Sequence, residues 1–314
     1  MNKARLRKWL YWIGLILGGG LFLYQIIAGI LALARLDQQS IHAWMLLAAL
    51  GAMLVVVLVQ MINWQIILRG LDVRIPFLDI SRGYVFSFLP RYIPGSVWGY
   101  LSRGEWLFQQ HRVPHAVTNS ASVLEILITF ISGIIVIGFT RMESGGWAIA
   151  RQAAFSMVLP VAAWKAMVMA AGLFSKKSTA AQAISRMGLL QWLAGILVYM
   201  GQWYLLGVAT LLAARAFSAA GQVPWTDWLP GTTFAFSLAW MTGFLILFVP
   251  GGLGVRELTL TGLLTLAILL PWEQSMLAAT SLRVLYSLAE FAWLLWAGGM
   301  RFLGKKPQKI PPMG

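Results

Sequence analysis

Long apolar stretches alternate with short polar loops along almost the whole chain. Four of these stretches carry no charged residue, and they cover residues 9–34, 43–68, 187–214 and 228–255. Each is longer than the roughly 20 residues that an α-helix needs to cross a bilayer. The pattern predicts an all-α polytopic membrane protein that forms a single integral membrane domain over residues 1–314.

Two proline-glycine breaks interrupt this apolar pattern at matched places in the two halves of the chain. The first lies in residues 91–99 (RYIPGSVWG) and the second in residues 248–257 (FVPGGLGVRE). Lipid does not tolerate open backbone, so a break at membrane depth is buried in protein or lines a polar cavity. Paired broken segments are the best sequence indication of a transporter's binding site. The break residues are Pro94, Gly95, Pro250, Gly251, Gly252 and Gly254.

Charges and loop residues divide the chain into six full spans and two broken segments, which we expect to be re-entrant hairpins. An alternative has eight spans, with residues 228–249 and 256–271 each crossing the membrane. The expected spans are about 9–34, 43–68, 113–140, 152–174, 187–214 and 274–301, and the expected hairpins are about 80–104 and 228–270.

Positive charge is concentrated in alternate loops, and cytoplasmic loops are the ones that carry excess Lys and Arg. We therefore expect a multi-pass protein of the cell's inner or plasma membrane with both termini in the cytoplasm. Each half then contains two spans, a hairpin and a span, in opposite orientations, which is an inverted repeat of residues 1–140 and 150–303. The cytoplasmic charges are Lys3, Arg5, Arg7, Lys8, Arg69, Arg74, Arg82, Arg103, Arg112, Lys176, Lys177, Arg186, Arg301, Lys305, Lys306 and Lys309.

Composition excludes several classes of function. The 314 residues are 59% hydrophobic and 11% charged, against roughly 25% charged residues in a soluble domain. The net charge of +14 lies in loops, where it sets topology and attracts anionic lipid headgroups, so we expect no binding to nucleic acid. The chain has no cysteine, which excludes disulfides, thiolate catalysis and cysteine-bound metals.

Four segments together resemble the transmembrane flippase-like domain of lysylphosphatidylglycerol synthases and its stand-alone relatives. They are residues 63–71 (NWQIILRGL), 88–97 (FLPRYIPGSV), 121–125 (ASVLE) and 249–257 (VPGGLGVRE). The resemblance runs in order over about 60–290, and the last segment is the most similar. One departure is Trp98-Gly99-Tyr100, which stands where many relatives have Gly-Gly-Asp, so an acidic role is not carried over to that place. Because the soluble aminoacyl-transfer domain of the synthases does not follow, the resemblance implies lipid handling without lipid synthesis.

Several ionisable side chains lie in apolar surroundings, where they are costly and usually functional. Glu125 is flanked by aliphatic residues, and Arg283 lies seven residues before Glu290, on the same face of the expected helix. We expect these three residues and Glu257 to gate a polar path. The alternative is a structural ion pair, of Arg283 with Glu290 or Glu125, that only locks helices together.

Arginines next to the breaks are candidates for binding an anion. Backbone N–H groups at half-helix N-termini favour anions, and arginine binds phosphate in a bidentate way. We therefore expect Arg91 and Arg256 to hold the headgroup, whereas positive-inside anchoring explains Arg103 well. The cargo would be an anionic phospholipid or a polyprenyl-phosphate-linked lipid or sugar.

The sequence shows no catalytic motif and predicts no cofactor. His111 and His115 have a metal-ligand spacing but no third ligand, so we expect no metal site. We predict a flippase-like lipid transporter that is neither an enzyme nor an ATPase. Two alternatives are a membrane-embedded lipid-phosphate transferase, with Glu105 or Glu257 as its base, and a scaffold that recruits a synthase or glycosyltransferase partner.

Overall fold

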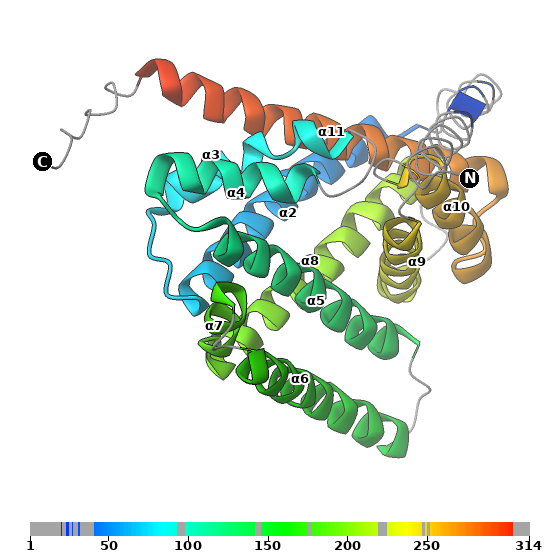
Figure 1. Ribbon diagram of the computed structural model, residues 1–314. Coiled ribbons are helices and arrows are strands. Elements are labelled where there is room, and N and C mark those ends of the chain that lie inside the picture. The colour runs from blue at the N-terminus through cyan, green and yellow to red at the C-terminus, as the bar shows by residue number, and fades with distance from the viewer. Residues whose placement is uncertain are drawn as a thin grey trace, which may run out of the picture.

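The computed structural model describes residues 41–92, 98–141, 146–174, 178–218, 225–246, 249 and 252–303, with five single positions between 20 and 31. This part of the chain is all-α and contains ten α-helices and one short 3₁₀-helix (Figure 1). The elements are α2 (Ala43–Gly70), α3 (Phe77–Phe86), η2 (Leu89–Tyr92), α4 (Trp98–His111), α5 (His115–Thr140), α6 (Gly146–Phe174), α7 (Thr179–Ser185), α8 (Leu189–Ala216), α9 (Trp225–Leu245), α10 (Val255–Ala267) and α11 (Trp272–Leu303).

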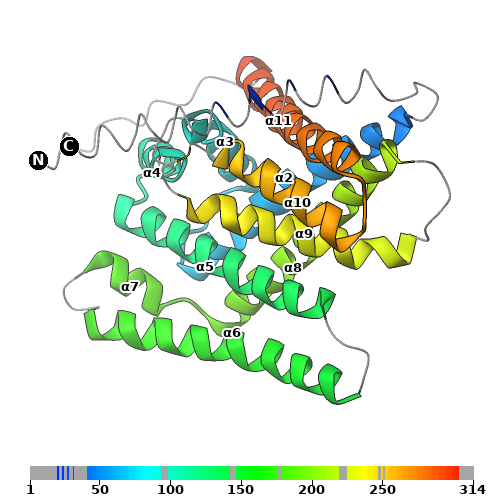
Figure 2. The same ribbon diagram turned by 90° about the vertical axis from the view of Figure 1, so that its right-hand side faces the viewer.

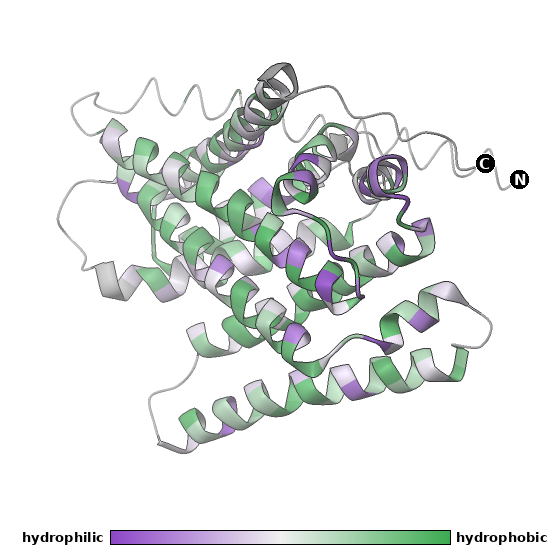
Figure 3. Ribbon diagram, turned by 90° about the vertical axis from the view of Figure 1, so that its left-hand side faces the viewer, coloured by the Kyte–Doolittle hydropathy of each residue, from purple (hydrophilic) through white to green (hydrophobic). Residues whose placement is uncertain are grey.

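Four described helices, α2, α5, α6 and α8, are long and apolar enough to cross a membrane. Their hydrophobic character continues along most of their length (Figure 3). This confirms the polytopic all-α prediction. Most of the observed helix ends lie within a few residues of the expected ones. The expected first span, at about 9–34, lies outside the described residues apart from single positions.

Helices α2 and α8 form the antiparallel pair at the centre of the bundle. At one end the backbone N–H of His42 donates to the carbonyl of Ala216 at 3.0 Å. At the other end Gly70 lies so close to the Met187 side chain that a Cβ at position 70 would overlap it. The two helices therefore run side by side over their whole length and support the remaining elements.

Helices α3 and α4 form a hairpin whose two ends lie together. The His111 Nε2 at the end of α4 is 3.5 Å from the Asp79 Oδ2 at the start of α3. The following helix α5 begins next to α7, where the Ser120 hydroxyl donates to the carbonyl of Ala180 at 3.4 Å. The base of this first hairpin therefore lies at the end of the bundle where α2 ends and α8 begins.

Helices α9 and α10 form a second hairpin, with its base at the opposite end (Figure 2). A Cβ added at Gly231 in α9 would approach Ile268, just after α10, to 2.6 Å. The Arg215 guanidinium near the end of α8 is 5.7 Å from the Trp228 ring in α9. The two hairpins thus enter the bundle from opposite ends.

The length of α10 contradicts the eight-span alternative. Its 13 residues rise about 20 Å at about 1.5 Å per residue. The hydrocarbon core of a bilayer is about 30 Å thick, so α10 is too short to cross it as a separate span.

Helix α6 lies at the edge of the bundle (Figure 2). Large side chains such as Trp147, Met157 and Leu173 are exposed on it. It contains Pro160, whose carbonyl accepts a hydrogen bond from the Trp192 indole at 3.0 Å, so this helix is still attached to α8. An apolar outer surface of this kind is what lipid contact requires.

Cysteine labelling tests the orientation of this bundle, because the chain has no native cysteine. Gln182 in α7 and Glu273 at the start of α11 are both exposed and lie at opposite ends in the expected topology. We expect a membrane-impermeant maleimide to label Glu273→Cys in intact cells and Gln182→Cys only after permeabilisation. The opposite labelling pattern would show that the loop charges do not orient this chain as expected.

Candidate functional site

A cavity of about 160 Å³ lies between the two hairpins. A water molecule needs about 10–15 Å³ of such space, so several fit. Side chains from both hairpins and from α2, α5, α8 and α11 form its walls. They are Gln60, Tyr84, Tyr100, Arg103, Glu125, Ile126, Thr129, Tyr199, Gln202, Trp240, Gly243, Phe244, Gly252, Arg256, Arg283, Tyr286 and Glu290.

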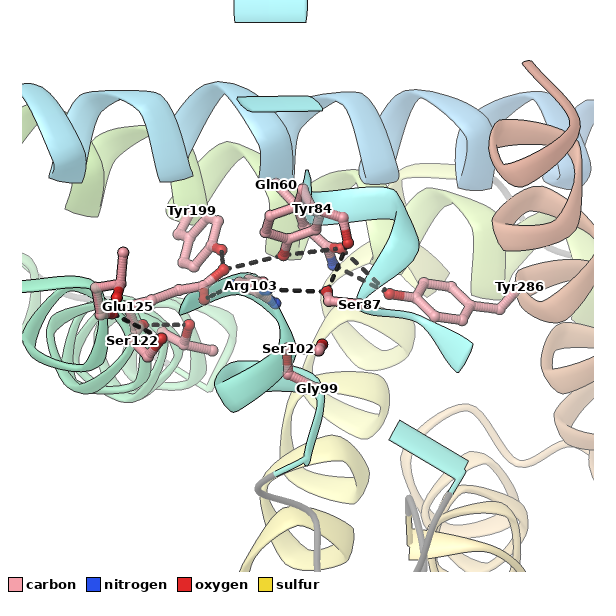
Figure 4. A network of polar contacts seen from close by, with 12 residues as sticks. Gln60, Tyr84, Ser87, Gly99, Ser102, Arg103, Ser122, Glu125, Tyr199 and Tyr286 are labelled. Carbon is pink, nitrogen blue, oxygen red and sulfur yellow. Dashed lines mark hydrogen bonds and ion pairs between the residues drawn. The ribbon is translucent and has the colours of Figure 1, made fainter. Parts of the chain in front are cut away.

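A buried ion pair, Arg103 with Glu125, forms one wall of the cavity (Figure 4). The Arg103 Nη1 donates to the Glu125 Oε2 at 2.5 Å, and the two residues are 1% and 4% exposed. The other carboxylate oxygen accepts hydrogen bonds from the hydroxyls of Tyr84 at 2.9 Å and Tyr199 at 2.8 Å. Both oxygens of Glu125 are therefore used, as a buried charge requires.

The guanidinium of Arg103 is also enclosed on its other sides. Its Nε donates to the Ser87 hydroxyl at 3.0 Å. Its Cζ is 3.9 Å from the centre of the Tyr84 ring and 4.9 Å from that of Trp64, within the range of cation–π attraction. The expectation that Arg103 is a positive-inside anchor is wrong, because the side chain points into the bundle and is paired there.

Arg283 does not pair with Glu125, contrary to one of the expected structural pairs. Its Nε lies 3.6 Å from the Glu257 Oε1, and the Glu257 Oε2 accepts the backbone N–H of Gly254 at 2.7 Å. Glu257 thus caps the first turn of its own helix α10 and also faces Arg283 on α11. Each hairpin supplies one member of an arginine–glutamate contact with the helix that follows it.

Arg256 is the cavity arginine with the fewest polar partners. Its Cζ lies 4.7 Å from the centre of the Phe236 ring and 5.9 Å from that of Tyr286. Among the described residues no carboxylate lies within 4 Å of its guanidinium. A cation in such a place is stabilised when an anion binds, since arginine can donate two parallel hydrogen bonds to a phosphate.

Two glycines allow the second break to fold close to α9. Gly252 has a φ of +66°, and a Cβ there would approach the carbonyl oxygen of Gly243 to 3.0 Å. A Cβ on Gly243 would approach the Cβ of Arg256 to 2.9 Å. Gly252 of the predicted break and Gly243 of α9 therefore allow Arg256 to lie at the tip of the hairpin, against the cavity.

Gln60 of α2 connects the two sides of the cavity. Its Nε2 donates to the Tyr286 hydroxyl at 3.1 Å, while the Tyr84 hydroxyl is 3.5 Å from its Oε1. Tyr286 lies between Arg283 and Glu290 on α11, and Glu290 is 4% exposed. The gate residues predicted from the sequence, Glu125, Arg283 and Glu290, therefore line one cavity, with Glu257 behind Arg283.

The sequence that forms this site also identifies the protein family of the chain. The profile of the lysylphosphatidylglycerol synthase TM region matches residues 11–299. The chain belongs to this family. No curated protein and no solved structure matches the chain. Membership makes it a multi-pass membrane protein of a family linked to lipid handling, and the matched range includes both hairpins and every residue of the cavity.

Some predicted residues cannot be compared with the structure. The side chain of Arg91 and the break residues Pro94, Gly95, Pro250 and Gly251 lie outside the described part. In the described part no group of three metal-binding side chains occurs. His111 and His115 instead face carboxylates, those of Asp79 at 3.5 Å and Glu105 at 3.6 Å.

Sequence reasoning missed the neutral polar residues of the cavity. Gln60 and Gln202 lie within long apolar helices, and amides inside such helices are a signal that reading charges alone overlooks. Tyr84 and Tyr199 carried no signal, because tyrosine is common at membrane interfaces. Their role depends on the position of Glu125, which only the folded chain shows.

Removing one member of the Arg103–Glu125 pair should unfold the protein more readily. We expect Arg103→Met and Glu125→Gln each to lower the free energy of unfolding by about 3–5 kcal/mol, because the remaining group is buried without its partner. The double variant should recover part of the loss. Thermal unfolding of the purified protein in detergent measures this.

The matched control is the Arg186–Asp72 pair, which is 3.8 Å apart and whose side chains are 61% and 67% exposed. Arg186→Gln should change stability by less than about 1 kcal/mol. Single Arg103 and Glu125 variants as stable as this control would show that the buried pair does not hold the bundle together.

Proposed function

We propose that the protein binds the phosphate of an anionic lipid headgroup in the cavity and moves it between leaflets, while the acyl chains stay in the surrounding lipid. The observation that carries this proposal is Arg256, a cavity arginine with aromatic contacts and, in the described part, no carboxylate within 4 Å. A cavity cation that has no carboxylate within 4 Å among the described residues is suited to a transient anionic ligand. The membership in a lipid-handling family supports the same conclusion.

The arrangement of the hairpins supports transport rather than simple binding. Both are proposed to be re-entrant, and their bases lie at opposite ends of the bundle while their inner residues line one cavity. Inverted repeats with broken helices meeting at a central site are typical of alternating-access transporters. In this proposal residues 1–140 and 150–303 are the two inverted halves. The protein lies in the inner or plasma membrane, and both of its termini face the cytoplasm.

The ion pairs give each half a separate role. Arg103 and Glu125 are fully enclosed and hold the first hairpin against α5. Arg283, Glu257 and Glu290 lie on the second side, where Tyr286 connects to Gln60. We propose that this second group changes partners when phosphate reaches Arg256, and that it forms the gate.

The two alternative functions have less support. A transferase needs a base at the phosphate, but Glu257 already accepts the N–H of Gly254 and faces Arg283. Glu105 is bonded to Gln109 at 2.6 Å and is exposed, away from the cavity-lining residues. A scaffold for a synthase or glycosyltransferase needs no polar cavity between hairpins, so the cavity favours transport over a scaffold. Because neither glutamate is placed to act as a base, we propose that the protein is not an enzyme.

Replacing Arg256 tests the proposal directly. We expect Arg256→Gln to reduce the initial rate of transfer of a fluorescent phosphatidylglycerol across proteoliposomes at least about tenfold, since a charged hydrogen bond contributes about 1.5–3 kcal/mol. The rate is measured per folded molecule, by dithionite quenching of the outer leaflet.

Arg141→Gln is the matched control, because Arg141 also lies over an aromatic ring, that of Phe234 at 4.1 Å, but outside the cavity. It should transfer lipid at the wild-type rate. Equal rates for wild type and both variants would mean that Arg256 does not bind the cargo.

A further inference from the structure

In the proposed function the phosphate lies in the cavity while the acyl chains stay in lipid, and this arrangement requires an opening through the side of the bundle. Helices α5 and α9 lie side by side on the outside of the bundle (Figure 2). On both helices a residue that lines the cavity is followed by an exposed one, Ile126 by Leu127 on α5 and Phe244 by Leu245 on α9. At the seam between α5 and α9, the cavity and the lipid-facing surface are therefore next to each other.

Three aromatic rings close the α5–α9 seam at the level of the cavity. The centre of the Phe130 ring on α5 is 5.4 Å from that of Phe244 and 6.2 Å from that of Trp240, and the two α9 rings stack on each other at 5.2 Å. Phe130 lies four residues after Ile126, which lines the cavity, and four before Ile134, which is exposed. Residues four apart share a helix face, so Phe130 lies on the stripe of α5 that passes from the cavity to the lipid.

On one side of these rings the two helices pack more closely. A Cβ added at Gly133 of α5 would overlap the Met241 side chain of α9. Behind α9, the Trp203 ring of α8 meets the Trp240 ring edge-on at 5.5 Å and holds it from the inside. Close packing thus fixes the seam at Gly133, whereas at Phe130 ring contacts join the two helices.

The seam can open at these rings without exposing backbone. Helices α5 and α9 keep their own backbone hydrogen bonds when they move apart, so no polar group of the main chain meets lipid. Lipid tails are as apolar as the ring surfaces, so a ring that turns from its neighbours to lipid loses packing contacts but no burial from water. Because each aromatic contact contributes little on its own, we expect an open seam as a minor state of the protein without cargo.

We propose that the α5–α9 seam is the lateral route that connects the cavity with the bilayer, and that the acyl chains pass through it when Phe130 parts from Trp240 and Phe244. The inference rests on the proposed function, because only a lipid whose headgroup enters the cavity needs such a route. The three rings close the seam when no lipid is present and keep hydrocarbon out of the polar cavity.

Locking the seam tests this route, because the chain has no native cysteine. Phe130→Cys and Phe244→Cys are introduced together into the full chain and joined by a short bis-maleimide before reconstitution. Transfer of fluorescent phosphatidylglycerol should fall to the rate of protein-free liposomes, whereas the same protein with both cysteines capped by N-ethylmaleimide should still transfer lipid. The control pair is Asp72→Cys with Arg186→Cys, whose native side chains are 3.8 Å apart and exposed. Joining this pair with the same reagent should leave transfer unchanged.

A smaller side chain at position 130 should act in the opposite direction and needs no cross-link. Phe130→Ala removes both ring contacts to α9 and should raise the transfer rate per folded molecule about three- to tenfold, as expected for the loss of one or two aromatic contacts. Ile134→Ala shortens an exposed side chain one turn further along α5 and should transfer lipid at the wild-type rate. A rate for Phe130→Ala at or below that of wild type would show that the rings are not the barrier.

The Arg256→Gln variant separates this inference from the function on which it rests. If the locked protein transfers lipid as fast as the capped protein while Arg256→Gln slows transfer, the phosphate site stands and the α5–α9 route is overturned. If the lock stops transfer while Arg256→Gln has the wild-type rate, the route stands and the binding of phosphate by Arg256 is rejected. If neither change alters the rate, lipid does not pass through this cavity and both proposals fall.

Discussion

The structure depends on how an arginine and a glutamate are kept charged inside an apolar bundle. Each ion loses several kcal/mol of hydration when it is buried, and only close pairing with further hydrogen bonds offsets this loss. Arg103 and Glu125 meet the requirement with partners from four helices or turns, including Ser87, Tyr84 and Tyr199. The position of the first hairpin, of α5 and of α8 is therefore tied to one polar cluster.

The second hairpin meets the same constraint in a looser way. Its arginine–glutamate contact, between Arg283 and Glu257, is 3.6 Å long, and Glu257 also binds the backbone of its own helix. The first pair is 2.5 Å apart and has both carboxylate oxygens occupied. The two pairs thus differ in how closely their charges approach, and the longer contact lies on the side of the cavity that carries Arg256.

Much of the architecture could be predicted from the sequence because hydrophobic length and loop charge act locally. The spans at 43–68 and 187–214 became α2 and α8 with shifts of two residues, and the breaks at Pro94 and Pro250 marked two hairpins. Pairing could not be predicted in the same way. Arg103 looks like a loop residue beside other basic residues, and only the turn of α4 against α5 brings it to Glu125. Spacing along the chain does not encode which of several arginines reaches a given carboxylate.

The cavity walls differ in how fully their charged groups are paired, and this difference bears on ligand binding. A cluster whose charges are all satisfied, such as that of Glu125, holds helices together but has little affinity left for a ligand. Arg256, set over Phe236 and Tyr286, is different, because no carboxylate lies within 4 Å of its guanidinium among the described residues. It belongs to the second hairpin and lines the same cavity as the Glu125 cluster. An anion bound there would stabilise a charge that the described residues do not pair closely, and in the proposed function this gain is what binding contributes before the cavity changes its side of access.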